Sequence, residues 1–149
     1  MPEPLRLPLH SLNLKLTMRT TYLGLSMLAL AFTACNKEPG EGGKAEIRGT
    51  VYEQRYSAQS GNPQDDPYPL AEHRVYIIYG DDDFASDDTR TGPNGEFHFP
   101  WLRKGEYRIY TISECDDHDN CTEGIFRSVE IGDRKEVVSV DRITVRNYN

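Results

Sequence analysis

The chain has 149 residues, which is enough for one domain with a substantial core, and its formal net charge is −7 at pH 7. Before Cys35, the basic residues Arg6, Lys15 and Arg19 are set against Glu3 alone, so the remainder carries 14 basic and 23 acidic residues. An acidic surface repels phosphate backbones, so the composition argues against a nucleic-acid partner and against electrostatic docking on anionic lipid.

An apolar run of 13 residues, YLGLSMLALAFTA, occupies positions 22–34. It is too short to span a membrane and is typical of a signal-peptide core. Met18 and Arg19 stand directly before it and form a short, positively charged start. We therefore expect translation to begin at Met18, so that residues 1–17 are an over-called start and residues 18–34 are a lipoprotein signal peptide.

Cys35 follows this run at once. The segment Phe32-Thr33-Ala34-Cys35 resembles the bacterial lipobox, in the form found in the Bacteroidetes, where the cysteine becomes the lipidated first residue. The alternative is an ordinary secreted protein with a free cysteine near its start. Asn36 does not resemble the aspartate of an inner-membrane retention signal. We therefore expect a lipid-anchored protein of the outer membrane, on its periplasmic or surface face, with residues 35–44 as lipidated cysteine and flexible tether.

The rest of the chain, residues 45–149, predicts a single domain of strands and no helical period. Alternating apolar residues separated by turn residues are typical of strands with one buried face. About seven strands at short spacing favour an all-β sandwich. We expect them over residues 45–53, 72–79, a short segment entering Thr91, 96–99, 106–114, 125–131 and 136–145.

Two irregular features interrupt this pattern. Residues 54–68 are polar and rich in turn residues, which predicts a long loop. In the last strand Val138 shares one parity with Val140, whereas Ile143 and Val145 have the other. A bulge near Asp141 and Arg142 would bring both pairs to the same face.

The most informative stretch is TGPNGEFHFPWLRKGEYRIY, from Thr91 to Tyr110. Pro93-Asn94-Gly95 provides a turn, and Gly105 a second one, with a strand after each. Together with Pro69-Leu70-Ala71 and Val75-Tyr76-Ile77 just upstream, it resembles the carboxypeptidase regulatory-like domains, which are transthyretin-like. The resemblance covers roughly residues 45–145 and implies a Greek-key β-sandwich, transthyretin-like or immunoglobulin-like. It implies little about function, because such sandwiches have many roles.

Cys115 and Cys121 enclose a short acidic loop. An exported protein meets oxidising conditions, so a disulfide is the first interpretation, and a loop of this size gains about 2 kcal/mol from it. The alternative is a metal site that uses both thiolates and His118, but a zinc site needs four ligands and this cluster offers no second pair.

Carboxylates are dense in the loop of residues 80–88, GDDDFASDD. Asp81, Asp83 and Asp87 are weak candidates for a calcium site, because Ca²⁺ prefers oxygen ligands. Their spacing does not follow a calcium-loop pattern, and adjacent carboxylates more often keep a surface loop soluble. No other cofactor is indicated.

A second apolar face is the feature that points most clearly to binding. Tyr76, Ile78, Tyr110 and Ile112 have the parity opposite to the expected core positions of their strands. Tyrosine combines a large contact area with a polar tip and suits recognition surfaces. The alternative is that the loop of residues 54–68 covers this face and makes it a satellite core.

Catalysis has little support, since His73, His98 and His118 fall in no nucleophile or acid–base arrangement. In the carboxypeptidases that contain such domains, the zinc and the catalytic residues lie in a separate domain. The sequence therefore predicts a non-enzymatic envelope lipoprotein that binds a protein or a glycan. The alternatives are a spacer subunit of an outer-membrane complex and, less favoured, a calcium-responsive periplasmic domain.

Overall fold

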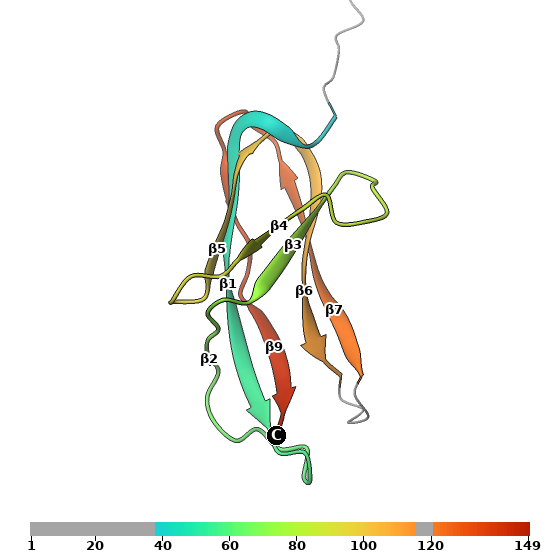
Figure 1. Ribbon diagram of the computed structural model, residues 1–149. Helices are drawn as coiled ribbons and strands as arrows, with labels where there is room; N and C mark the ends of the chain where they lie inside the picture. The colour runs from blue at the N-terminus through green and yellow to red at the C-terminus, as the bar shows by residue number, and fades with distance from the viewer. Residues whose placement is uncertain (1–37, 116–120) are drawn as a thin grey trace, which may run out of the picture. The chain divides into compact units, whose positions relative to one another are not determined.

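The computed structural model describes residues 38–115 and 121–149, and these form two facing β-sheets (Figure 1). The predictions for residues 1–17, the signal peptide, Cys35 and His118 concern positions outside these ranges. Among the described residues, no helix is long and apolar enough to cross a membrane. The strands are β1 (Glu41–Tyr56), β2 (Tyr68–Pro69), β3 (Arg74–Tyr79), β4 (Asp87–Arg90), β5 (Glu96–Leu102), β6 (Gly105–Glu114), β7 (Thr122–Ile131), β8 (Val137–Ser139) and β9 (Ile143–Tyr148).

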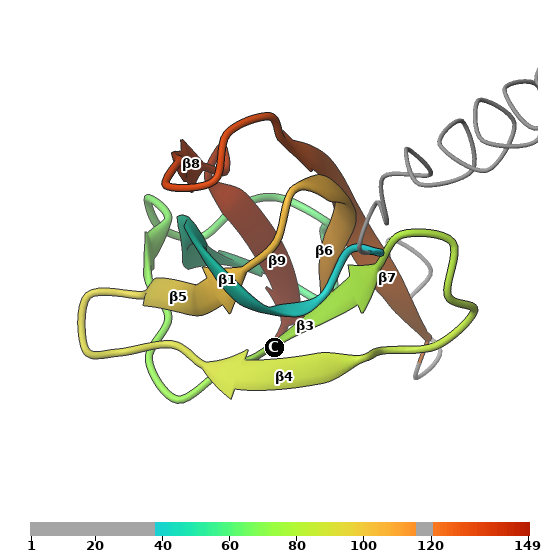
Figure 2. The same ribbon diagram turned by 90° about the horizontal axis from the view of Figure 1, so that it is seen from above.

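The predicted β-sandwich is confirmed, with nine strands in the described residues rather than about seven. One sheet has the order β4-β3-β6-β7, and its neighbouring strands are antiparallel. The other sheet has five strands built around β1, which is antiparallel to β2 and β5 and parallel to β8 and β9. Figure 2 looks along the sandwich and shows the two layers. The two extra strands are the short β2 and the division of the last strand into β8 and β9.

The core lies between the sheets and is formed by alternate residues of the facing strands. This is the pattern that the sequence predicted for β1, β3 and β6, where inward positions are nearly inaccessible to solvent and mostly apolar, with Thr111 and Ser113 of β6 as buried polar residues. β5 and the C-terminal strands complete it. The buried cluster comprises Ala45, Ile47, Val51, Val75, Ile77, Phe97, Phe99, Leu102, Tyr107, Ile109, Ile131, Ile143 and Val145.

The turn expected at Asn94 and Gly95 is present between β4 and β5. Gly95 has a φ of 75°, and a Cβ built on it would lie 2.3 Å from the carbonyl oxygen of Val51, so this position needs glycine. Its own carbonyl accepts a 2.8 Å hydrogen bond from the N–H of Val51. The turn is not a hairpin, because β4 and β5 belong to different sheets.

The first strand begins earlier than the sequence indicated. Residues 41–44, expected in the flexible tether, belong to β1. The buried hydroxyl of Tyr107 fixes this start: it accepts a 2.9 Å bond from the Gly40 N–H and donates a 2.7 Å bond to the Arg103 carbonyl. The Arg103 N–H in turn donates to the carbonyl of Gly40, at 2.8 Å. These tertiary contacts order a segment that has no apolar residues of its own.

The bulge expected at residues 141–142 is confirmed by the register of β8 and β9 along β1. Val138 lies opposite Ile47, and Ile143 lies opposite Val51. The chain therefore advances by five residues from Val138 to Ile143 where β1 advances by four. One extra residue between β8 and β9 reverses the parity of the side chains. The apolar positions before and after it therefore both face the core.

Candidate binding face

Three aromatic side chains form a row across the outer face of the four-stranded sheet. Tyr76 on β3 lies directly opposite Tyr110 on β6, and Tyr110 lies opposite Phe126 on β7. The ring centroids of the tyrosines are 4.8 Å apart, those of Tyr110 and Phe126 are 4.9 Å apart, and both pairs are stacked. We call Tyr76, Tyr110 and Phe126 the aromatic row.

The aromatic row is accessible, and it becomes more so toward the edge of the sheet. Tyr76 and Tyr110 are half-buried, and Phe126 is 51% exposed. Ile112, next to the row on β6, is 40% exposed. Ile78 differs: it has the outward parity that the sequence indicated, yet it is only 4% exposed, so its assignment to an accessible binding face was wrong.

The sequence prediction missed Phe126, although its parity could have identified it. Ile125 and Val129 pack against the core, so Phe126 between them must point outward. What the sequence could not supply is the register. The antiparallel pairing of β6 with β7 places this ring beside Tyr110 rather than one pair further along.

Ring stacking decides what this face can offer to a partner. Tyr110 is covered by a ring on each side, so its exposed parts are the ring edge and the hydroxyl group. Phe126 stands on the last strand of the sheet, and Tyr110 covers only one face of its ring. The row can therefore contribute apolar edges, two phenolic hydroxyls and the exposed part of the Phe126 ring, a combination typical of interfaces that recognise polar and apolar groups together.

Charged side chains frame the row on the β3 side. Asp88 on β4 lies opposite Tyr76 and forms an ion pair with Arg74, with Nε and Oδ2 3.5 Å apart. Further along β6, the guanidinium of Arg108 donates to the carbonyl of Asp82. The aromatic row is thus bordered by positively and negatively charged groups, as in the polar rim of a protein interface.

The loop expected over residues 54–68 does not supply the cover that the alternative interpretation required. Gln54 donates from Nε2 to the carbonyl of Asp65, and the N–H of Gln64 donates to the carbonyl of Arg55. These contacts fold the loop back on β1, which belongs to the other sheet.

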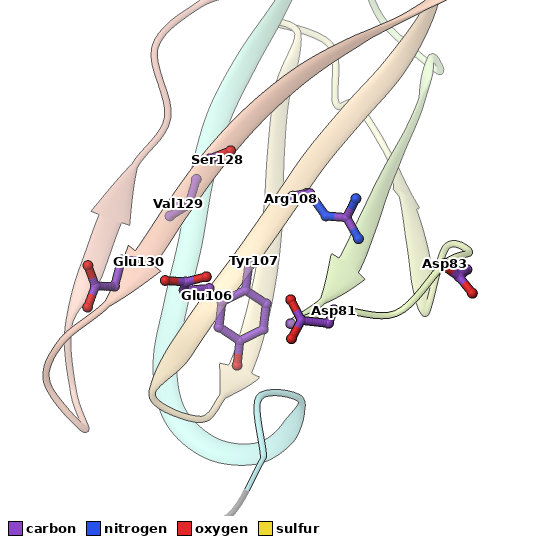
Figure 3. A pocket seen from close by; sticks show the side chains of 9 residues that line it. Asp81, Asp83, Glu106, Tyr107, Arg108, Ser128, Val129 and Glu130 are labelled. Carbon is purple, nitrogen blue, oxygen red and sulfur yellow. The ribbon is translucent and has the colours of Figure 1, made fainter.

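The acidic loop lies at the end of the sandwich where β6 begins. A hollow of about 630 Å³ there is lined by Asp81, Asp83, Glu106 and Glu130, with Arg108 among them (Figure 3). Figure 3 shows the carboxylates of Asp83 and Glu130 at opposite ends of this hollow.

The candidate calcium ligands Asp81, Asp83 and Asp87 are not gathered at one point. Within residues 38–115 and 121–149, no group of three or more His, Cys, Asp or Glu side chains could hold a metal ion. Asp87 instead accepts a 2.8 Å hydrogen bond from the N–H of Asp88.

Cys115 and Cys121 are joined by a disulfide, with Cα atoms 5.4 Å apart. The bond lies where β6 ends and β7 begins, at the opposite end of these strands from the acidic hollow. Because the two sulfurs are bonded to each other, they do not provide the thiolates that the alternative metal site required.

The described histidines are separated and have different surroundings. His73 is half-buried, its Nε2 lacks a partner, and burial lowers its pKa below the ordinary 6.5. His98 lies on the other sheet with Nε2 2.6 Å from Oε2 of Glu46.

Trp101 projects into solvent from β5. It is 68% exposed and has a φ of 61°, which is unusual for a bulky residue. Because β5 belongs to the five-stranded sheet, Trp101 is not part of the aromatic row.

Comparisons with known proteins add little to this geometry. No family model matches the chain, and no curated protein does. Among solved structures, a candidate carbohydrate-binding protein of Pseudomonas aeruginosa aligns with a TM-score of 0.41 and 19% identity, over 72% of this chain and 91% of the other. An (S)-allantoin synthase aligns with a TM-score of 0.35 and 11% identity, over 70% of this chain and 42% of the other. At these values neither likeness indicates a function for this chain.

Proposed function

We propose that the chain is a non-catalytic lipoprotein of the cell envelope that binds another envelope protein or a glycan through the outer face of its four-stranded sheet. The observation that carries this proposal is the aromatic row, Tyr76, Tyr110 and Phe126, with Ile112 beside it. Large apolar side chains that stay exposed together on one face mark an interaction site more often than isolated ones do.

The remaining parts of the proposal rest on sequence motifs. The lipobox-like segment before Cys35 supports a lipid anchor, and Asn36 after it supports an outer-membrane location. The motifs from Pro69 to Tyr110 support membership of the carboxypeptidase regulatory-like domains. A sandwich of this kind acts by presenting a surface, so no catalytic residue or cofactor is assigned.

The experiment is cross-linking of intact native cells that produce the full chain, followed by mass spectrometry of the attached molecules. The test variant is Phe126→Ala, which removes the most exposed ring of the aromatic row. The matched control is Tyr56→Ala, which removes one ring of the stacked Tyr56–Tyr148 pair on the other sheet. We expect Phe126→Ala to lose a partner that wild type and Tyr56→Ala both retain.

Two results would overturn the proposal. If wild type and Phe126→Ala capture the same molecules to the same extent, the aromatic row is not the binding face. If cross-links are confined to the anchor region and to abundant neighbours, the chain is a spacer. The spacer alternative has structural support, because β9 runs parallel to β1, which places Tyr148 at the far end of the sandwich from Gly40.

A further inference from the structure

β7 is an open edge of the four-stranded sheet. It pairs with β6 along all ten of its residues, and no other described strand pairs with it. Along its length only Ile131 is buried. An edge strand of this length presents a row of backbone N–H and C=O groups that can pair with a further strand.

Two of the devices that usually protect such an edge are missing, because β7 contains no proline and is not short. Its protection is limited to the charged side chains of Glu123, Arg127 and Glu130. One of its carbonyls, that of Phe126, accepts a 2.9 Å hydrogen bond from the guanidinium of its own neighbour, Arg127. The Arg127 side chain therefore occupies an acceptor that a strand could use instead.

The sequence of β7 is complementary to itself when a second copy runs antiparallel to it. With Ile125 opposite Ile125 of the other copy, Arg127 lies opposite Glu123, and this happens twice because the arrangement is two-fold symmetric. In the same register Ser128 lies opposite Thr122. Opposite charges and hydroxyl pairs at directly opposed positions stabilise antiparallel strands.

The aromatic row also fits this register. Phe126 lies opposite Gly124 of the other copy, and Gly124 has no side chain to compete for space. Within one copy the ring already leans toward this glycine, since a Cβ built there would lie 2.7 Å from a ring atom. The two phenylalanine rings would then meet diagonally across the junction, a separation that aromatic side chains can bridge.

Other registers also place the outer faces of the two copies on the same side of the joined sheet. They do not bring the opposite charges and the hydroxyl groups into directly opposed pairs. Directly opposed residues point to the same face, so the register can shift only in steps that preserve parity. A pair centred on Phe126 leaves Arg127 opposite Ile125 and Glu123 opposite Val129. A pair centred on Arg127 places two guanidinium groups against each other.

We propose that the binding partner of the β7 edge is β7 of a second copy of this chain, paired antiparallel about Ile125. The two four-stranded sheets then form one continuous sheet, and their aromatic rows form one surface. A protein or glycan with two equivalent sites would bind both rows and gain affinity from bivalency. Dimerisation through β7 does not depend on which protein or glycan binds the aromatic rows.

The test is sedimentation of the detergent-solubilised full chain over a range of concentrations, with charge reversals at the junction. Arg127→Glu and Glu123→Arg should each weaken dimerisation by roughly tenfold or more, because two attractive pairs become repulsive. The double variant Glu123→Arg/Arg127→Glu should restore it. Since Glu123 also pairs with Arg146 of its own chain, at 3.1 Å, the restoration is the decisive result.

The matched control is Glu130→Arg, a charge reversal on the same strand but beyond the paired segment, which should leave dimerisation unchanged. Ile125→Cys provides a second measurement, because it should cross-link to itself under mild oxidation whereas Glu130→Cys should not. A chain that stays monomeric, or a double variant that is as weak as the single ones, would overturn the proposal. Capture of an unrelated extended peptide by a monomeric chain would do the same.

Discussion

The outer faces of the two sheets differ although both sheets cover the same core. On the five-stranded sheet, Glu46 lies between Arg48, at 2.9 Å, and His98, at 2.6 Å, so this face carries an ion pair and a hydrogen bond between polar side chains. On the four-stranded sheet, the corresponding central positions are occupied by the aromatic row. Exposed ion pairs contribute little to stability and favour solubility, whereas exposed rings favour association. The alternation that defines the strands is the same on both sheets, and the chemistry of the outward positions distinguishes the face that we propose to bind a partner.

The largest effect on stability is expected from a substitution in the core between the two sheets. Ile109 of β6 is fully buried between them, and Ile109→Ala should lower the free energy of unfolding by about 2–5 kcal/mol, because a cavity replaces the side chain. Urea unfolding followed by circular dichroism measures this. Ile112→Ala, on the same strand but facing outward, is the control and should change stability far less. Equal losses would mean that Ile112 belongs to a core and not to the binding face.

The next effect concerns the centre of the aromatic row. Tyr110→Ala removes two ring stacks, each of which contributes about 0.5–1.5 kcal/mol beyond area burial, and should also abolish partner capture. Tyr56→Ala removes one stack on the other sheet, so it should destabilise the domain less and leave capture unchanged. Thermal unfolding and cross-linking of the same preparations compare the two. Capture that survives Tyr110→Ala would contradict the functional difference between the faces.

A smaller effect should appear when the pH is lowered. Burial is the main cause that lowers the pKa of His73 in the folded state. The unfolded chain therefore binds a proton more readily, and stability should fall as the pH drops below about 6.5, the ordinary pKa of histidine. His73→Gln cannot take up this proton, so its unfolding midpoint in urea should fall less between neutral and mildly acidic pH. Parallel losses in wild type and variant would exclude His73 as the cause.

The smallest effect is expected from the charged face. The hydrogen bond with His98 is the main cause that lowers the pKa of Glu46 below 4.5. The stability that this pair contributes is present above the unfolded pKa and is lost as the pH falls through the folded one. Glu46→Gln should therefore change stability at neutral pH only slightly and leave partner capture intact. NMR titration of the carboxyl carbons measures the pKa, and a value at or above 4.5 would contradict the assignment.

The sequence alone determined the class of fold and much of the core. Alternation identified the buried sides of β1, β3 and β6 because one face of each strand meets the core while the other meets water. The mismatch of parity between Val138 and Ile143 identified the bulge, since no other arrangement buries both. Asn94 and Gly95 predicted their turn because both residue types tolerate a positive φ, which Gly95 adopts.

Tertiary structure decided how these pieces meet. Neither of the turns at Gly95 and Gly105 closes a hairpin, because each carries the chain from one sheet to the other, and turn residues specify a bend but not its partner. Residues 41–44 are ordered by contacts that begin at Tyr107, far along the chain. The aromatic row exists because the register of β6 and β7 sets Phe126 beside Tyr110. Local patterns report which side of a strand is buried, whereas neighbours across a sheet are fixed only when the whole core closes.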